Sequence, residues 1–406
     1  MKFEDFAQIN PKVQIPKNSD VSFVEMADLI PSIRSVNSSV EKPLKGSGSK
    51  FSNCDTLFSR ITPCLQNGKI SQVKNLTNNI GFGSTEFFVF RGREGVSISD
   101  FVYYLSQSEL IKEPAIKSMV GASGRQRADL DVIRNIDIKQ YSIDDQIQIV
   151  GLLSNYDNLI ENNNRRIAIL EDMAQSLYRE WFVNFRYPNH EDNLDADGKP
   201  KLIDSPLGQI PTGWEVKRIK DLGDVNTGKT PSKKKQEYYN NADVPFLKTP
   251  DMHGAIFSVD IGDYLSLEGA NSQKNKFVPA NSVCVSCIGA RAGVVTITSE
   301  KLQTNQQINS VVLNDTKYRE YFYLFAVSLH QKIHALGSSG ATMTNVNKSK
   351  FEGIEVVVPP EEVIQGFSSK TASSFDLILN LQKRNKNLKK QRDMLLPKLI
   401  SGQIEL

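Results

Sequence analysis

The sequence predicts an α+β protein in which two similar mixed α/β domains are separated by two long antiparallel helices. Three observations lead to this fold class. Segments of the second half repeat segments of the first half in the same order, at a shift of about 220 residues. Two stretches carry apolar residues at heptad spacing, and the other regions alternate short apolar runs with Gly, Asn, Ser and Pro. Together these features indicate an internal duplication with pseudo-twofold symmetry and a coiled-coil spacer.

The composition is that of an ordinary globular protein, with 39% hydrophobic and 23% charged residues. At 406 residues the chain is long enough for two domains and their connectors. A net charge of +3 excludes a strong overall basic field, so nucleic-acid binding would depend on local patches. Four cysteines are too few to stabilise such a chain by disulfides, so we expect none. No apolar run is long enough to cross a bilayer, and none follows Met1 as a signal sequence would, so we expect a cytoplasmic protein.

The internal repeat depends on three matched segments. One match would carry little weight, whereas ordered matches at a nearly constant shift imply a duplicated unit of domain plus helix. A repeat of this length is a whole domain, which excludes the short stacked repeats of solenoids. The matches are residues 21–29 with 244–252, residues 121–124 with 337–340, and residues 154–157 with 373–376, which also bring Arg165 over Arg384 and Ile169 over Leu388.

The first long helix is predicted from a seam of apolar residues in alternating steps of four and three. Over about four heptads, such spacing is typical of a helix packed against another helix. At a rise of about 1.5 Å per residue, the seam is roughly 50 Å long. The seam residues are Ile149, Leu153, Tyr156, Ile160, Asn163, Ile167, Leu170, Ala174, Leu177 and Trp181.

The second long helix repeats this seam in a shorter and more polar form. It runs from about Ser373 to Leu396, and we expect Pro397 to end or kink it. Two helices of one duplicated unit would pack antiparallel. The seam residues of the second helix are Ile378, Leu381, Asn385, Leu388 and Leu395.

Polar residues on the two helices leave two questions open. Asn163 and Asn385 lie near the middle of their seams, where a buried amide can fix the register of a coiled coil, and solvated amides are the alternative. The basic residues of the second helix either form a solvated face or contact phosphates or an acidic partner. These basic residues are Lys383, Arg384, Lys386, Lys389, Lys390, Arg392 and Lys398.

The globular regions contain both kinds of secondary structure. Short apolar runs at residues 87–90 and 283–288 indicate strands, and residues 321–327 indicate a helix. Between the first long helix and the second globular region, Pro and Gly become frequent, which is typical of a linker. The predicted organisation is a first domain at residues 1–145, a first long helix at 146–185, a linker at 186–212, a second domain at 213–360, and a second long helix with a C-terminal tail at 361–406.

One segment has the spacing of a phosphate-binding loop. Residues 223–230, GDVNTGKT, fit that pattern letter by letter. The chemistry requires a helix that opens directly after the Lys and Thr, so that its free amides face the phosphates. A polar stretch without helical periodicity follows at residues 231–235, and the matching residues 9–12 lack the glycines. We therefore expect no nucleotide site at Lys229.

Metal-binding and catalytic patterns are equally weak. Cys284 and Cys287 lie in a predicted strand, where an i, i+3 pair points to opposite faces. His330 and His334 have helical ligand spacing but lack the Glu that follows the first His of zinc proteases. No nucleophile with a matching base is recognisable. We therefore expect no metal site, no catalytic residues and no enzyme activity.

Three stretches resemble the specificity subunit of type I restriction-modification systems. Residues 173–185 (MAQSLYREWFVNF) resemble the end of that family's central conserved helix, residues 205–216 (SPLGQIPTGWEV) the start of its second recognition domain, and residues 395–404 (LLPKLISGQI) its C-terminal end. The resemblance covers the whole chain in order. One departure is that the first half opens at Phe3 without a Gly-Trp-Glu-Val start, so we expect its initial strand to differ.

The resemblance implies a non-catalytic subunit with two target-recognition domains, each reading one half of a bipartite double-stranded DNA site. The paired helices would act as a ruler between the halves and as a docking surface. The implied partners are two modification subunits, which methylate adenine with S-adenosylmethionine, and restriction subunits with endonuclease and translocase activity, which use ATP and Mg²⁺. No cofactor is expected in this chain.

Base reading requires hydrogen-bond donors and acceptors at groove edges, whereas phosphate contacts hold the protein in place. We therefore expect polar and basic loop residues to contact DNA, with an ordinary solvated surface as the alternative. The competing functions are a scaffold whose helices bind proteins, an ATPase acting through Lys229, and a self-sufficient methyltransferase. The candidate DNA-binding residues are Arg125, Arg127, Lys229, Lys233, Lys234, Arg291, Thr342, Thr344 and Lys348.

Overall fold

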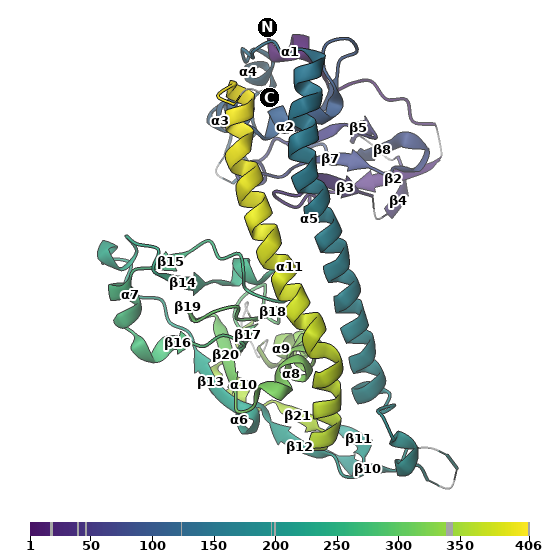
Figure 1. Ribbon diagram of the computed structural model, residues 1–406, viewed down its shortest axis with the longest axis vertical. Helices are drawn as coiled ribbons and strands as arrows, with labels where there is room; N and C mark the ends of the chain where they lie inside the picture. The colour runs from purple at the N-terminus through teal and green to yellow at the C-terminus, as the bar shows by residue number, and fades with distance from the viewer. Residues whose placement is uncertain are drawn as a thin grey trace. The chain divides into compact units, whose positions relative to one another are not determined.

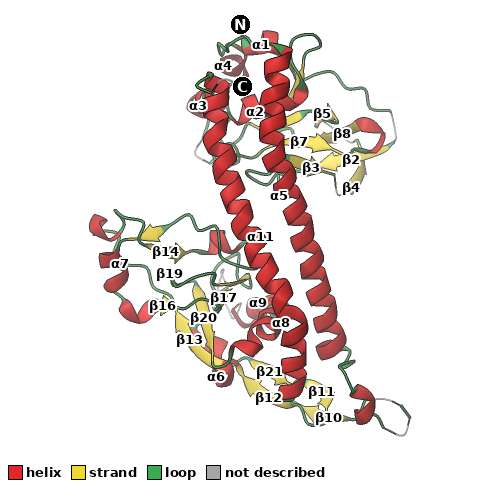
Figure 2. Ribbon diagram, viewed as in Figure 1, coloured by secondary structure: helices red, strands yellow, loops and turns green. Residues whose placement is uncertain are grey.

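The computed structural model describes residues 1–16, 19–38, 40–44, 47–122, 124–195, 197–198, 200–337 and 344–404. The chain forms two compact units. Unit 1 comprises residues 1–162 and 387–406, and unit 2 comprises residues 163–386. Both units contain helices and sheets (Figure 2), so the prediction of a mixed α/β protein is confirmed. Among the helices of the described part, none has the length and apolar character needed to span a bilayer.

The larger sheet of unit 1 is buried on both faces. Along β9 (Phe87–Gly92), Phe88 and Phe90 join one apolar cluster, whereas Phe87 and Val89 join another. The predicted strand at residues 87–90 is confirmed, and its continuous apolar run reflects burial on both faces. The sheet order is β1 (Ala7–Ile9), β9, β6 (Thr56–Ser59), β7 (Ile70–Lys74) and β3 (Ser35–Asn37), with β3 parallel to β7 and the other pairs antiparallel.

Unit 1 adds a smaller sheet and short helices. Helix α2 (Ser99–Gln107) contacts β9 and buries a continuous run of side chains from Phe101 to Ser106. The smaller sheet has the order β4 (Val40–Pro43), β2 (Asp20–Val24), β8 (Ile80–Gly83) and β5 (Ser49–Ser52), with β2 parallel to β8. The other helices are α1 (Phe3–Phe6), α3 (Glu109–Lys117) and α4 (Leu130–Arg134).

Unit 2 repeats most of the strand pairing of unit 1, without a strand equivalent to β3 in its larger sheet. One antiparallel sheet has the order β13 (Gly223–Thr227), β20 (Ile308–Leu313), β17 (Val283–Ser286) and β18 (Val295–Ile297). The other has the order β15 (Tyr264–Leu265), β14 (Val244–Leu247), β19 (Leu302–Thr304) and β16 (Phe277–Val278), with β14 parallel to β19 as β2 is to β8. The helices are α6 (Ile219–Leu222), α7 (Leu267–Asn271), α8 (Arg319–Ser328), α9 (His330–Gly337) and α10 (Lys348–Glu352).

The start of the first half differs from the start of the second, as predicted. In unit 2, β12 (Glu215–Arg218) pairs with β21 (Glu355–Val358) over four residues. In unit 1, the corresponding pairing is the single bridge between Lys2 and Asp137. The segment that the sequence predicts as a linker is also partly ordered, because β10 (Leu202–Ser205) and β11 (Gly208–Pro211) form a hairpin within it.

Two long helices complete the fold (Figure 1). Helix α5 (Ile143–Tyr178) continues into a π-helical turn at Arg179–Val183, and α11 spans Glu361–Ser401. In unit 1, the beginning of α5 shares a core with the end of α11, as shown by Leu153 and Leu399. In unit 2, the later part of α5 shares a core with the earlier part of α11, as shown by Ala174 and Phe375.

The second helix does not end at Leu396 before Pro397, so that part of the prediction is wrong. Helix α11 begins at Glu361, twelve residues before Ser373, and continues through Pro397 to Ser401. Proline removes one backbone hydrogen bond. The loss is offset because Leu396, Leu399 and Ile400 around it are buried in the core of unit 1.

The two seam asparagines are buried rather than solvated. Asn163 and Asn385 are each 7% exposed, and Asn163 Nδ2 donates to Asn385 Oδ1 at 2.8 Å. Asn385 Nδ2 in turn donates to Asn164 Oδ1 at 2.8 Å. The two amides therefore pair with each other inside the seam, the arrangement by which a polar residue fixes the register of paired helices, and Asn385 also bonds to the exposed Asn164 beside it.

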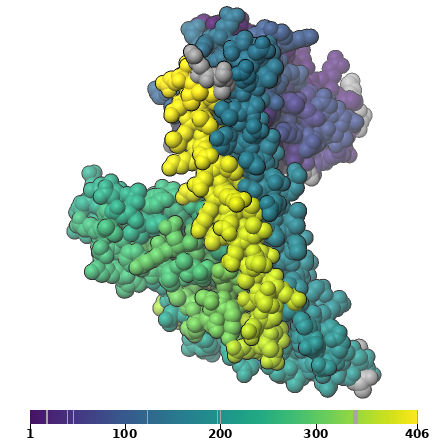
Figure 3. Space-filling view, in the orientation of Figure 1, coloured from purple at the N-terminus to yellow at the C-terminus, as the bar shows by residue number. Residues whose placement is uncertain are grey.

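The basic residues of α11 do not form one uniform face. Lys383, Arg384, Lys390 and Lys398 are exposed on the helix surface, part of which Figure 3 shows in yellow. By contrast, Lys386 Nζ donates to the carbonyl of Val259 at 2.9 Å. Arg392 is only 6% exposed and belongs to a buried polar network in unit 1.

Candidate nucleic-acid interface

In unit 1, Glu86 connects two arginines from different segments. Arg127 Nη2 lies 2.6 Å from Glu86 Oε1, and Arg60 Nε lies 3.7 Å from Glu86 Oε2. Hydrogen bonds from Arg127 lower the pKa of Glu86 below its ordinary value, so the carboxylate stays ionised. The backbone also joins these segments, because Arg60 N–H donates to the Glu86 carbonyl and Ala128 N–H donates to the Arg60 carbonyl. Glu86 therefore fixes two cations at one edge of the sheet.

An open pocket of about 750 Å³ lies beside this cluster and is lined by Lys12, Lys50 and Arg60. The Arg60 guanidinium stacks over Phe88 with its carbon 5.0 Å from the ring centroid. Lys12 and Lys50 are exposed, and within the described residues neither forms an ion pair or a side-chain hydrogen bond. A fixed guanidinium beside two free ammonium groups suits a phosphate backbone, since such contacts need charge but no sequence information.

The predicted residue Arg125 lies next to this cluster in an exposed turn. Its N–H donates to the carbonyl of Ala122 at 2.9 Å, and Gly124 has a φ of +78° that other residues rarely adopt. Arg125 and Arg127 are thus presented differently. Arg125 extends from a glycine turn, whereas Arg127 is held by Glu86.

In unit 2, the backbone of Lys229 is fixed on both sides while its side chain is exposed. Its N–H donates to the Thr304 carbonyl at 2.9 Å, and its carbonyl accepts from Gln273 Nε2 at 2.8 Å. An added Cβ at Gly228 would lie 2.1 Å from the Asn305 carbonyl oxygen, so this close approach requires glycine. The glycine therefore serves strand packing. The residues after β13 form turns, and no α-helix opens after Lys229 in the described segment up to residue 237.

The other predicted contact residues of unit 2 lie in different settings. Lys233, Lys234 and Arg291 are exposed in loops, and Lys348 begins α10 and pairs with Glu352 at 3.3 Å. Thr344 is 9% exposed, and its hydroxyl lies 3.0 Å from His334 Nδ1, so little of it is free for an external contact. Thr342 lies outside the described residues, as do residues 338–340 of the second glycine turn.

A segment rich in amides lies near Lys229 and was missed by the sequence analysis. It connects β19 to β20, and Gln306 is exposed at its tip, where Thr230 Oγ1 donates to Gln306 Oε1 at 2.6 Å. Amide side chains can read adenine through paired hydrogen bonds. The signal in the sequence was the density of amides between two strands: Gln303, Asn305, Gln306, Gln307 and Asn309.

The cysteine pair and the histidine pair lie in apolar or helical surroundings. Cys284 in β17 belongs to one apolar cluster, whereas Cys287, directly after the end of β17, belongs to another, so the two thiols lie on opposite sides of the sheet. Burial raises the pKa of both thiols to about 12. His330 and His334 lie side by side on α9, with ring centroids 4.8 Å apart and ring planes tilted by 51°. Among the described residues, no group of three or more His, Cys, Asp or Glu side chains could hold a metal ion.

The predicted helix-packing residues lie on the inner sides of α5 and α11. Leu170, Leu177 and Leu395 are partly buried against the cores of their units, and Tyr156 and Leu388 are also partly exposed. The fully buried members are Ile149, Leu153, Ile160, Ile167, Ile378 and Leu381.

Comparisons with known proteins agree on one family. A family model described as the type I restriction modification DNA specificity domain matches residues 211–390. The specificity subunit of the type I restriction enzyme HindI from Haemophilus influenzae is 32% identical, over 89% of this chain and 89% of that protein. The MjaIX specificity subunit from Methanocaldococcus jannaschii is 28% identical over 84% of this chain and 76% of its own length.

Among solved structures, the S subunit of a type I restriction-modification system from M. genitalium covers 98% of this chain and 95% of its own length. Its TM-score is 0.55 at 12% sequence identity, so this likeness concerns the fold alone. The identity to the Haemophilus protein over almost the whole length of both chains is decisive for the family. This chain therefore belongs to the specificity subunits of type I restriction enzymes.

Proposed function

We propose that this chain recognises a bipartite DNA site, with unit 1 and unit 2 each reading one half. The observation that carries the proposal is the shared strand pairing of the two units, each with basic and polar loops after equivalent strands. Two similar reading modules in one chain suit a target of two separated half-sites. The chain itself supplies recognition and no chemistry.

Backbone hydrogen bonds support the duplication behind this proposal. In unit 1, the residue that follows β6 donates its backbone N–H to the residue before β9, and its carbonyl accepts from a distant loop. In unit 2, the residue that follows β17 makes the equivalent two bonds, with the residue before β20 and with another distant loop. A duplicated domain retains such backbone bonds even where side chains have diverged. The equivalent bonds are Arg60 to Glu86 and Ala128 to Arg60 in unit 1, and Cys287 to Gln307 and Val346 to Cys287 in unit 2.

The burial pattern of the long helices supports an antiparallel coiled-coil spacer. Nine buried residues of the first helical segment have buried counterparts in α11 at a constant separation of 218 residues, as between Ile149 and Phe367. This separation is one residue less than in the sequence match of residues 154–157 with 373–376, because Phe375 is buried whereas Asp376 is exposed. Two helices with one repeated seam can pack on each other about a twofold axis. The corresponding pairs are Gln146 and Ile364, Ile149 and Phe367, Leu153 and Thr371, Asp157 and Phe375, Ile160 and Ile378, Asn163 and Leu381, Ile167 and Asn385, Ala174 and Arg392, and Trp181 and Leu399.

Different side chains would have different roles in DNA binding. Lys12, Lys50 and Arg60 would hold phosphates, because they are cations around an open pocket. Arg125 and Gln306 would reach base edges, because each lies exposed at the tip of a turn. The remaining predicted contacts, Lys229, Lys233, Lys234, Arg291 and Lys348, would add charge around unit 2.

The proposed partners are double-stranded DNA, two modification subunits and the restriction subunits of the same system. Adenine methylation with S-adenosylmethionine and cleavage with ATP and Mg²⁺ would be carried out by those partners. The outer faces of α5 and α11 would dock the modification subunits. These assignments come from membership of the family rather than from any site in this chain.

A domain exchange tests the proposal. Residues 213–360 would be replaced by the same region of a relative, and methylated adenines would be mapped across the genome of cells that carry the complete system. We expect one half of the methylated motif to change, while the other half and the spacing stay the same because unit 1 and the helices are retained. A motif in which both halves change, or in which neither changes, would contradict independent reading by the two units.

A further inference from the structure

The buried seams of α5 and α11 carry polar residues at different positions. At six of the nine corresponding positions, one helix buries a polar or charged residue where the other buries an apolar one. At two of these six, nearby backbone groups satisfy the polar side chain: Gln146 bonds to backbone groups that precede α5, and Thr371 Oγ1 donates to the Phe367 carbonyl. The other four positions depend on the partner helix. The two helices therefore share a burial pattern but differ in chemistry. The four positions are Asp157 and Phe375, Asn163 and Leu381, Ile167 and Asn385, and Ala174 and Arg392.

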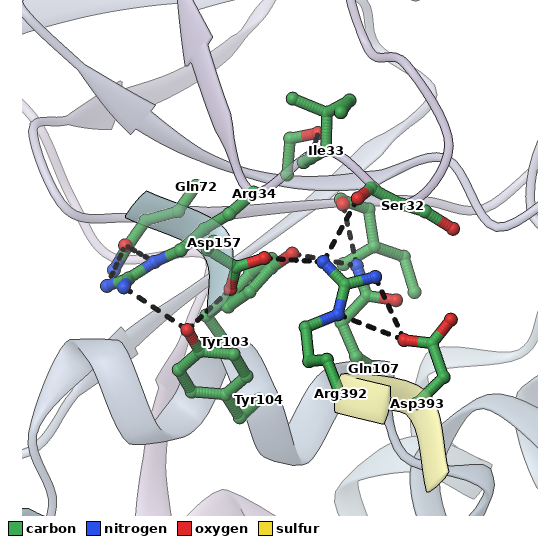
Figure 4. A network of polar contacts seen from close by, with 12 residues as sticks. Ser32, Ile33, Arg34, Gln72, Tyr103, Tyr104, Gln107, Asp157, Arg392 and Asp393 are labelled. Carbon is green, nitrogen blue, oxygen red and sulfur yellow. Dashed lines mark hydrogen bonds and ion pairs between the residues drawn. The ribbon is translucent and has the colours of Figure 1, made fainter. Parts of the chain in front are cut away.

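In unit 1, Asp157 of α5 and Arg392 of α11 form a buried ion pair (Figure 4), with side chains 3% and 7% exposed. The remaining polar atoms of this pair also have partners. Tyr104 Oη donates to Asp157 Oδ2 at 2.6 Å, and Arg392 Nη1 donates to the Ser32 carbonyl at 3.1 Å. Arg34 Nη1 extends the network to Tyr104 Oη at 3.3 Å. The carboxylate of α5 and the guanidinium of α11 are thus paired across the seam.

In unit 2, polar and apolar residues of the seam are also matched. Asn163 donates to Asn385, so the two amides face each other. The four apolar counterparts belong to one core cluster. These counterparts are Ile167, Ala174, Phe375 and Leu381.

We propose that these four positions form a pairing code, by which α5 accepts α11 of its own chain and rejects the α5 of a second copy. The reason follows from the burial pattern. Arg392 occupies on α11 the position that Ala174 occupies on α5. A second α5 in the place of α11 would therefore put Ala174 opposite Asp157 and leave that carboxylate buried without its cation, which is strongly unfavourable.

The same mismatch arises at the other positions. Two paired copies of α5 would put Asn163 opposite Ile167, because Ile167 corresponds to Asn385. Two paired copies of α11 would put Arg392 opposite Phe375, and Asn385 opposite Leu381. Every like-with-like pairing thus buries polar groups without partners, whereas α5 with α11 satisfies all of them. This is specificity by rejection of the wrong partner, and it is independent of DNA recognition.

Reciprocal charge reversal in the full-length chain tests the code. Chains with Asp157→Arg and chains with Arg392→Asp would be co-expressed with different affinity tags. Each chain then mismatches its own seam, and it matches the seam of the other. We expect the two chains to co-purify at least about tenfold more than two differently tagged Asp157→Arg chains, since a difference of about 1.4 kcal/mol gives that factor.

Two controls isolate the buried pair. Replacing Arg392→Asp by Lys390→Asp moves the same charge reversal to an exposed side chain two residues away on α11, and we expect no co-purification above the wild-type background. A chain with both Asp157→Arg and Arg392→Asp restores its own match and should remain unpaired with the wild type. Folded variants that stay monomeric in every combination, or that pair equally with themselves, would overturn the code.

A thermal-unfolding cycle provides a second readout if the reversed chains do not fold. Asp157→Phe and Arg392→Ala each copy the residue at the corresponding position of the other helix. We expect each single variant to lose roughly 10 °C in melting temperature, because it leaves one charge facing an apolar residue. The double variant should melt above both single variants, because its seam is apolar on both sides. Single losses that simply add in the double variant would contradict the matching rule.

Discussion

Unit 1 and unit 2 share one strand pairing but attach it to the long helices through different chemistry. In unit 1, α2 meets the helices through a polar network in which Tyr104 donates to Asp157 and Asp157 pairs with Arg392. Burial raises the pKa of Tyr104, so its hydroxyl remains a donor at neutral pH. This contact depends on directed bonds between named partners.

In unit 2, α8 meets the helices through aromatic rings, together with one ion pair at its first residue, between Arg319 and Asp376 of α11 at 3.2 Å. Phe182 lies 4.8 Å from Tyr321 and 4.9 Å from Phe367, measured between ring centroids. Trp181 and Tyr178 extend the same cluster toward Phe367. Such contacts stabilise through buried area and edge-to-face packing, with little dependence on charge.

The comparison separates two properties of a helix contact. An aromatic contact tolerates small shifts because its stabilisation follows from area, whereas a buried ion pair accepts only a partner of opposite charge at one position. The aromatic cluster of unit 2 should therefore contribute stability that is largely independent of pH and salt. Under the proposed pairing code, unit 1, which includes residues 387–406, contributes the selectivity for its own C-terminal segment.

Removing a ring from the aromatic cluster of unit 2 should have the largest effect on stability. Phe367 is fully buried, and Phe367→Ala should cost about 3–5 kcal/mol, with little change between low and high salt. Denaturant unfolding followed by tryptophan fluorescence would measure it. Val183→Ala is the control, because Val183 is 58% exposed. A loss that varies with salt would break the distinction between the units.

A second ion pair of unit 1, with a fully buried carboxylate, tests whether burial makes such pairs important for stability. Arg91 Nε and Nη2 donate to the two oxygens of Asp55, at 2.6 and 2.7 Å, and Asp55 is fully buried. Asp55→Ala should destabilise unit 1 by about 3 kcal/mol, because it leaves Arg91 without its carboxylate. Asp137→Ala removes the exposed pair with Lys2 and should change little in the same unfolding assay. Equal losses from both variants would argue against burial as the cause.

Variants in the two units should affect different properties of DNA binding: overall affinity in unit 1 and sequence preference in unit 2. Lys12→Ala with Lys50→Ala in unit 1 should weaken binding to all sequences and reduce the salt dependence by about two phosphate contacts. Gln306→Ala in unit 2 should instead relax one position of one half-site. Fluorescence anisotropy of the complete complex on labelled DNA at several salt concentrations would measure both, with exposed Lys117→Ala as the control. A lysine variant with altered sequence preference would contradict this division.

The smallest expected effect is a pH dependence at Glu86. Its folded pKa is lowered by Arg127, so its ionised form contributes stability above the ordinary value of 4.5. That contribution is lost as pH falls below 4.5 toward the folded pKa. The stability difference between the wild type and Glu86→Gln should therefore be constant at neutral pH and shrink in acid, as measured by urea unfolding at a series of pH values. A difference that grows in acid would reverse the assigned sign.

Much of the fold was predictable because it follows from periodicity. Heptad spacing predicted both long helices. Short apolar runs predicted the strand at residues 87–90 and one at 283–288, of which β17 covers residues 283–286. The missing Gly-Trp-Glu-Val start predicted a weaker initial pairing, found as the single bridge of Lys2. The DNA-contacting residues remain predictions, since the sequence shows charge and turns but not which cations are already paired.

Only the tertiary structure determined which polar residues contact one another. The sequence shows Asp157 and Arg392 as two charges more than two hundred residues apart, and only folding brings them into one buried pair. It likewise left Asn163 and Asn385 open between solvent and seam, and it gave no sign that Lys12 and Lys50 share a pocket with Arg60. Local spacing determines which helices and strands form, whereas burial and pairing depend on contacts between distant segments that spacing does not encode.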